Sequence, residues 1–195
     1  MWCLHFSKSN PVQLFLKCGP IYIRKVTNMA KKKKGKRLHK TLVEQILDKN
    51  KIPYKQYEFA THTKGDVAQM EVDHDQVDEH HIYKTLVLSG PTTGPVVGVL
   101  PIDEHLDEKK LAKVSGNKKV DMVPLKDLVK TTGYEHGANT PVGIWEKNHF
   151  PIYFDNSAQE QGQILVSSGQ IGRSVELDAT ELATLVHGTF TDLLE

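Results

Sequence analysis

The sequence predicts an α/β fold, with a single compact domain built on a mixed sheet and helices packed around it. Three observations favour this class. Helical and strand patterns are interleaved along the chain without a regular strand–helix–strand repeat. The composition is that of a globular protein, with 38% hydrophobic and 25% charged residues. A length of 195 residues suits one domain, and no internal repeat is visible.

The first predicted elements are a helix and a strand. Apolar residues recur every three to four positions from Leu38, which indicates an amphipathic helix ending near Asn50. Pro53 breaks this pattern, and the alternation over residues 54–59 is typical of an edge strand. Residues 60–81 are polar, and we expect a loop there with a short helix.

Two strong strands follow, over residues 82–88 and 95–100, and the Gly- and Pro-containing segment 90–94 predicts a turn between them. The remaining expected elements are helices from Asp107 to about Gly116, from Pro124 to about Thr131 and from Ala179 to about Phe190, strands over 152–154, 163–167 and 174–177, and a loop over 133–141.

Charged residues are distributed unevenly between the start of the chain and the rest. Residues 1–40 carry 11 Lys or Arg and no Asp or Glu, whereas residues 41–195 carry 14 basic and 24 acidic residues. We therefore expect 38–195 to form the domain, and 1–37 to be a disordered or over-extended N-terminus with a basic arm at 31–37. The basic arm is consistent either with binding to an RNA backbone or with a solubilising tail, and the net negative charge of the rest of the chain favours the RNA-binding role.

The start of the chain reads as an upstream extension. Residues 1–28 have no periodicity, and they lack the apolar stretch and cleavage site of a secretory signal. Met29, followed by Ala30 and four lysines, is the start that we favour. Both cysteines, Cys3 and Cys18, precede it, so the domain has no cysteine for a disulfide, a nucleophile or a thiolate metal site.

This interpretation gives a first testable result. A chain that begins at Met29 should have the same melting temperature and the same activity as the full chain, because the removed residues belong to no predicted element. Thermal unfolding and an activity assay on both chains check it, and a clear loss of either would show that residues 1–28 are needed.

Lys84 stands out because it lies inside a strand of apolar and aromatic residues. By the two-residue period of a strand it shares a face with Ile82, Leu86 and Leu88, which we expect to be the core side. A lysine there either points into a ligand pocket or reaches solvent over its apolar stem, and the sequence favours neither. The glycine-rich loop 133–141 is the second candidate, since such a backbone can present N–H groups to an oxygen atom; a plain connecting loop is the alternative.

Four blocks in order resemble the YbaK/EbsC family, from about Leu38 to Leu194. They are Tyr83-Lys84-Thr85-Leu86, Gly133-Tyr134 with Gly137, Thr140-Pro141 and Gly143, then Asp155 with Ala158-Gln159-Glu160, and Val166-Ser167 with Gly169. Members of this family are tRNA-editing deacylases, related to the editing domain inserted in some prolyl-tRNA synthetases. The resemblance implies the YbaK type of mixed α/β domain.

The resemblance also implies the roles of single residues. The essential lysine of the family falls on Lys84 and a pocket serine on Ser167. The other substrate-binding positions that it implies are Phe59, Thr85 and the ester-contacting loop Gly137, Ala138, Asn139, Thr140 and Pro141. Ala138, Thr140 and Ser174 replace a glycine, a serine and an acidic residue common in the family, which leaves the amino-acid preference open.

The implied function is trans-editing deacylation of mischarged tRNA(Pro). In this branch the thiol of Cys-tRNA(Pro) attacks its own ester carbonyl and leaves as a thiolactone. The alternatives are water-based hydrolysis of Ala-tRNA(Pro) and a catalytically silent regulatory or binding member. The implied partners are mischarged tRNA(Pro) and, as a second candidate, prolyl-tRNA synthetase. No DNA, membrane or cofactor is expected to bind, and the expected location is the cytoplasm.

A metal site is the remaining hypothesis. Asp73, His74 and Asp75, together with Asp78, Glu79, His80 and His81, form a polar run rich in potential ligands. Their spacing matches no closed tetrahedral site, so a solvated run is favoured and no metal is expected.

Overall fold

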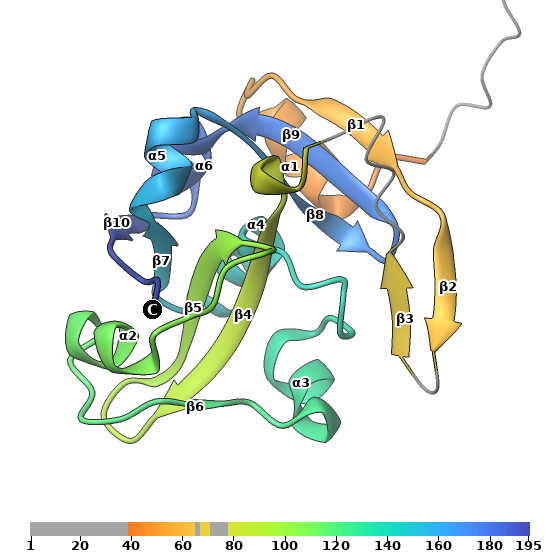
Figure 1. Cartoon of the computed structure of the whole chain (residues 1–195). Helices are drawn as coiled ribbons and strands as arrows, with labels where there is room; N and C mark the ends of the chain where they lie inside the picture. Colours follow the sequence, from red (N-terminus) through yellow and green to blue (C-terminus); the bar gives the residue numbers. More distant parts are fainter. Residues whose placement is uncertain (1–38, 65–66, 71–77) are drawn as a thin grey trace, which may run out of the picture. The chain divides into compact units, whose positions relative to one another are not determined.

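The larger of the two main sheets has five strands and is mixed (Figure 1). The computed structural model describes residues 39–64, 67–70 and 78–195, which all belong to one compact unit, Leu38–Glu195. The basic arm and residues 1–28 lie outside the described residues. The strands of this sheet are β4 (Tyr83–Gly90), β5 (Gly94–Pro101), β6 (Asp121–Met122), β7 (Ile152–Asp155) and β10 (Thr189–Thr191), in the order β10-β7-β5-β4-β6.

Strand directions in this sheet confirm the predicted mixed α/β class. The β4–β5 hairpin and the β4–β6 pair are antiparallel, whereas β5 with β7 and β7 with β10 are parallel. The parallel pairs need crossover connections, and helices supply them. In Figure 1, α3 (Leu125–Thr132) lies on the side of β4 away from β5, which leaves α3 and β4 as two walls of one region.

A second sheet of three antiparallel strands has the order β1-β9-β8. Its strands are β1 (Lys55–Glu58), β8 (Gln163–Gln170) and β9 (Arg173–Asp178), and β1 lies at the edge as predicted. A parallel bridge between Ile82 and Leu165 connects β8 with the start of β4. This bridge brings the end of β8 next to the centre of β4.

The expectation of a loop over residues 60–81 is wrong for its first part. A two-stranded hairpin, β2 (Thr61–Lys64) with β3 (Val67–Met70), occupies it, followed after the gap by the 3-10 turn Glu79–His81. Most residues of this hairpin are polar in sequence, so the apolar alternation that reveals a half-buried strand is missing.

Local capping signals account for most helix boundaries. The α1 helix (Leu42–Lys49) begins at a capping box of Thr41 and Glu44, and Asp107 and Asp178 cap α2 and α6 through their side chains. The helices α2 (Glu108–Val114) and α3 lie where they were predicted, whereas α4 (Pro141–Asn148) and α5 (Asn156–Gln161) were missed.

The last helix, α6 (Ala179–Leu185), is shorter than expected. His187 has a positive φ of 49°, and the N–H of Gly188 donates to the carbonyl of Ala183, so the chain turns out of the helix there. Phe190 therefore belongs to β10, where it pairs with Phe154 instead of extending the helix.

The main core lies on the opposite face of β4 from the one that the sequence pattern suggested. Tyr83 and Val87 are buried in the largest apolar cluster, together with residues of α1, α4, β7 and α6. Leu88, on the face of Lys84, packs in a smaller cluster against α2. Both faces of β4 are apolar, because both are covered, and period two alone cannot tell which one meets the larger core.

Candidate active site

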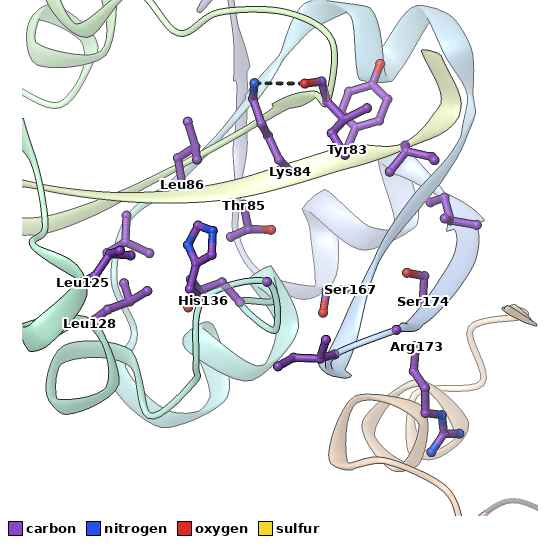
Figure 2. A pocket seen from close by; sticks show the side chains of 18 of the residues that line it. Tyr83, Lys84, Thr85, Leu86, Leu125, Leu128, His136, Ser167, Arg173 and Ser174 are labelled. Atoms are coloured by element: carbon purple, nitrogen blue, oxygen red, sulfur yellow. Dashed lines mark hydrogen bonds between the residues drawn. The ribbon is translucent and has the colours of Figure 1, made fainter. Parts of the chain in front are cut away.

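A pocket of about 440 Å³ opens along the free edge of β4 (Figure 2). Strand β6 pairs with β4 at Leu88 and Ser89, and β8 meets the chain just before β4 at the Ile82–Leu165 bridge, so within the described residues the part of β4 between these two pairings has no strand on that side. Side chains from β4, β6, α3, the loop before α4 and the β8–β9 region line the pocket. Its size is in the range of small-ligand sites, about 300–1,000 Å³.

The peptide groups of Thr85 face this pocket. The carbonyl of Val87 accepts from the N–H of Val123, on the side of β4 away from β5. In an antiparallel ladder the direction of these groups alternates, so Thr85, two residues earlier, presents its N–H and C=O to the same side. A substrate that lies along this edge meets one donor and one acceptor at a fixed spacing.

Two hydroxyl groups add to these backbone atoms. Thr85 is 9% exposed, and its Oγ1 atom has no hydrogen-bond partner among the residues that the structure describes. Leaving such a group unpaired costs about 1–3 kcal/mol, which a bound substrate can recover. Ser167 is half-buried, and its Oγ accepts from the N–H of Gly169 at 3.2 Å, so the hydroxyl proton is available to a ligand.

Lys84 lies at the pocket with its ammonium on the other face of β4 from Thr85 (Figure 2). Its Nζ donates to the carbonyl of Ile102 at 3.1 Å and to that of Glu104. Burial lowers the pKa of the Lys84 ammonium, and the carboxylates of Asp103 and Glu104 act in the opposite direction. Lys84 is thus a half-buried cation held at the rim by neutral acceptors, and no carboxylate of the described part of the chain forms an ion pair with it.

The predicted loop 133–141 forms the wall opposite β4. Gly137 has a φ of 82°, in the left-handed region that favours glycine. The Thr132 hydroxyl organises the loop, since it accepts from the N–H of Tyr134 at 3.0 Å and lies 3.1 Å from Oδ1 of Asn139. At Gly143 an added Cβ would lie 2.0 Å from the Tyr134 hydroxyl, so glycine is required for Tyr134 to pack on α4.

The structure brings some of the predicted site residues together and leaves others behind the wall. Lys84, Thr85, Gly137, Asn139 and Ser167 line the pocket. Phe59 is buried in a small cluster with Ile82 and Leu165, and Ala138, Thr140 and Pro141 are buried outside the pocket lining. These four support the wall in this structure and do not border the cavity.

Sequence reasoning missed several groups of the pocket. The apolar wall includes Met122 and Leu125, both about half exposed, and Leu128. His136 also lines the pocket, and it stands inside a motif that the sequence analysis quoted without assigning it a role. Its position two residues before Ala138, in the glycine-rich loop 133–141, was a sequence signal that could have marked it as a candidate pocket residue.

The described residues offer no place for a metal ion. Outside the gaps at 1–38, 65–66 and 71–77, no group of three or more His, Cys, Asp or Glu is arranged to hold one. Asp73, His74 and Asp75 lie outside the described residues. His80 instead pairs with Asp103 through Nδ1 at 2.8 Å. In the same described part of the chain, no helix is both long and apolar enough to cross a membrane.

Comparison with known proteins identifies the family. The family described as "Aminoacyl-tRNA editing domain" matches residues 62–185, which include β4, the loop 133–141 and β8. The chain belongs to this family. The editing domain thus contains every residue that lines the pocket, and Phe59, which does not border the cavity, lies before it. The family membership expected from the four sequence blocks is confirmed.

One curated relative aligns with most of this chain over nearly its own full length. It comes from Enterococcus faecalis (strain ATCC 700802 / V583) and is named "Putative Cys-tRNA(Pro)/Cys-tRNA(Cys) deacylase EbsC". The two are 42% identical over 165 residues, which is 85% of this chain and 98% of the relative. The match therefore includes both walls of the pocket.

Solved structures confirm the fold of the editing domain. One, named "Crystal structure of a putative trans-editing enzyme for prolyl tRNA synthetase", has a TM-score of 0.57 and 21% identity, covering 62% of this chain and 74% of the other. Another, "Crystal structure of hypothetical protein APE2540", has a TM-score of 0.65 and 18% identity, covering 78% and 99%. At these identities the likeness extends to the fold.

Proposed function

We propose that this protein deacylates mischarged tRNA(Pro) in trans, with Cys-tRNA(Pro) as its main substrate. The observation that carries the proposal is the pocket at the free edge of β4, which combines peptide groups, two hydroxyls and a cation without a carboxylate among its lining residues. Membership of the editing family and the name of the 42% identical relative support the same substrate.

The chemistry fits an ester that is already activated. A cavity of about 440 Å³ exceeds what a cysteinyl side chain needs, so the terminal nucleotide can share it. The Thr85 N–H and the Ser167 hydroxyl are donors for a carbonyl oxygen that gains negative charge during attack. The proposed role of Lys84 is to hold the tRNA 3′ end or the ester oxygen at the rim. Gly137 and Asn139 of the loop 137–141 would fix the aminoacyl group against β4.

The nucleophile in this proposal is the cysteinyl thiol of the substrate. All lining residues are described, and none of them is a cysteine. The sulfur attacks the ester carbonyl, the bond to the ribose oxygen breaks, and the products are cysteine thiolactone and free tRNA. Positioning the two groups within one molecule can lower the barrier substantially without a protein nucleophile.

The test compares tRNA(Pro) charged with cysteine, alanine or proline at one enzyme concentration. We expect the fastest loss of label from Cys-tRNA(Pro), slower loss from Ala-tRNA(Pro) and none above the buffer control from Pro-tRNA(Pro). Faster hydrolysis of Ala-tRNA(Pro) would replace the proposal with the water-based alternative, and inertness towards both mischarged substrates would favour a silent binding member.

The proposal assigns catalysis to residues 38–195 and tRNA affinity to the basic arm, 31–37. Prolyl-tRNA synthetase, which would release mischarged tRNA(Pro), is the proposed protein partner, and the cytoplasm is the proposed place of action. Residues 41–195 carry ten more acidic than basic residues, so the body repels a polyanion and the arm can offset this.

Deleting residues 31–37 should raise KM and leave kcat unchanged. Each phosphate contact on a nucleic acid contributes about −0.7 to −0.9 to the slope of log affinity against log salt, so the deletion should flatten the salt dependence. Backbone contacts that stabilise ground and transition states equally change KM alone. Steady-state kinetics from low to high salt provide the check, and a lower kcat or an unaltered KM at low salt would count against the arm.

A further inference from the structure

His136 is the pocket residue that the proposed function leaves without a role. It comes from the loop before α4, and its ring points toward β4 beside Thr85, with Ser167 across the same space (Figure 2). Among the described residues, no hydrogen bond or ion pair holds this ring. An exposed histidine of a loop has no structural need to point into a cavity.

The other titratable side chains of the pocket are already bound. Lys84 donates to two backbone carbonyls, and the guanidinium of Arg173 is paired with Glu44. The Tyr83 hydroxyl donates to Oγ of Ser157 at 3.1 Å. The walls formed by α3 and β6 contribute apolar side chains, and no Asp or Glu lines the pocket. On its own loop, the neighbouring Glu135 is exposed.

The proposed reaction needs a proton acceptor at this place. A cysteine thiol ordinarily titrates near pH 8.5, so at neutral pH most of it is protonated and a poor nucleophile. Thr85, with an unpaired Oγ1 and a peptide N–H on the pocket side, marks where the ester binds. The imidazole of His136, beside Thr85, is therefore close to the aminoacyl group whose thiol must lose its proton.

We propose that His136 is the general base of the deacylation, an inference that rests on the proposed function. An imidazole nitrogen accepts the thiol proton while the sulfur attacks the ester carbonyl carbon. The bond from that carbon to the ribose oxygen breaks, and the imidazolium returns the proton to the departing oxygen. Cysteine thiolactone and tRNA with a free terminal hydroxyl leave, and His136 is neutral again.

His136→Gln should lower the single-turnover rate on Cys-tRNA(Pro) by about 100-fold, the lower end of the contribution of a general base. The melting temperature should change little, because the ring makes no hydrogen bond or ion pair with another described residue. His105→Gln is the matched control, since His105 is also an exposed loop histidine and lies outside the pocket. Its rate should equal that of the unmodified protein.

The pH profile separates a base from a packing residue. A general base acts only when it is deprotonated, so the rate should rise with pH through the neutral range and His136→Gln should flatten the rise. The α-amino group of the substrate titrates in a similar range, so the profile is also measured with N-acetyl-cysteinyl-tRNA(Pro), which lacks that amine. The rise should persist with this substrate.

Added imidazole gives an independent readout. His136→Ala leaves an opening at the mouth of the pocket, and free imidazole should restore part of its rate. An undiminished rate in His136→Gln, or a loss without a change in profile and without rescue by imidazole, would overturn the assignment. If the unmodified protein does not cleave Cys-tRNA(Pro) at all, the proposed function itself has failed, which is a distinct outcome.

Discussion

Lys84→Met is expected to lower deacylation of Cys-tRNA(Pro) by at least about 100-fold while the protein stays folded. Methionine keeps the length and the apolar stem of the side chain and removes the charge. In the proposed site that charge contacts the substrate, where buried charge-assisted contacts are strong. The measurement is the single-turnover rate together with the melting temperature of the variant.

Stability should change little, for a reason visible in the structure. Burial lowers the pKa of the Lys84 ammonium, so relief of this desolvation offsets part of the loss of its two hydrogen bonds to the carbonyls of Ile102 and Glu104. The carbonyl of Glu104, in the exposed segment after β5, can bind water instead. We expect a loss of less than about 1 kcal/mol in the free energy of unfolding.

Lys110→Met is the matched control for this experiment. Lys110 also donates through Nζ to a backbone carbonyl, that of Leu194, and it lies outside the pocket. Its variant should deacylate at the normal rate. An equal loss of rate in both variants, or full activity in Lys84→Met, would contradict the role proposed for Lys84.

Glu44→Gln is expected to cause the largest loss of stability, about 3 kcal/mol in the free energy of unfolding. Glu44 is 1% exposed, and its Oε1 accepts from the Arg173 guanidinium at 2.9 Å while Oε2 accepts from the N–H of Thr41, also at 2.9 Å. The substitution leaves Arg173, whose side chain is 12% exposed, without its counter-charge. For a domain of this size, a melting temperature lower by roughly 10 °C should follow.

A double-mutant cycle isolates the ion pair from the capping box. Glu44→Gln combined with Arg173→Gln removes both charges, so it should be less destabilised than the sum of the two single variants. The control is Asp121→Asn, which removes one partner of the exposed Lys119–Asp121 pair and should cost at most about 1 kcal/mol. Additive losses in the cycle would mean that the pair contributes no coupling.

Local signals predicted the strands β4 and β5, the edge position of β1 and the starts of α2 and α6, because each depends on residues a few positions apart. Two kinds of feature could not be obtained in that way. The Glu44–Arg173 pair joins residues 129 positions apart, and no pattern within α1 or β9 announces it. Most residues of the hairpin β2–β3 are polar, so its strands lack the apolar alternation that would have revealed them.

The candidate site shows the same limit. Four ordered sequence blocks located Lys84, Thr85, the loop 137–141 and Ser167, and the fold places most of them around one cavity. The sequence could not show that the Lys84 ammonium and the Thr85 hydroxyl lie on opposite faces of β4. Nor could it separate the wall-supporting Thr140 and Pro141 from Gly137 and Asn139, since burial depends on how α4 packs against the loop.

The most direct measurement is a single-turnover reaction with Cys-tRNA(Pro) in which the released cysteinyl product is identified by mass. Substrate-assisted deacylation predicts cysteine thiolactone together with intact tRNA, and no release from a cysteinyl ester whose thiol has been methylated. Release of S-methylcysteine from the methylated substrate at a rate equal to that of the unmethylated ester, or an ester no shorter-lived than in buffer, would contradict it.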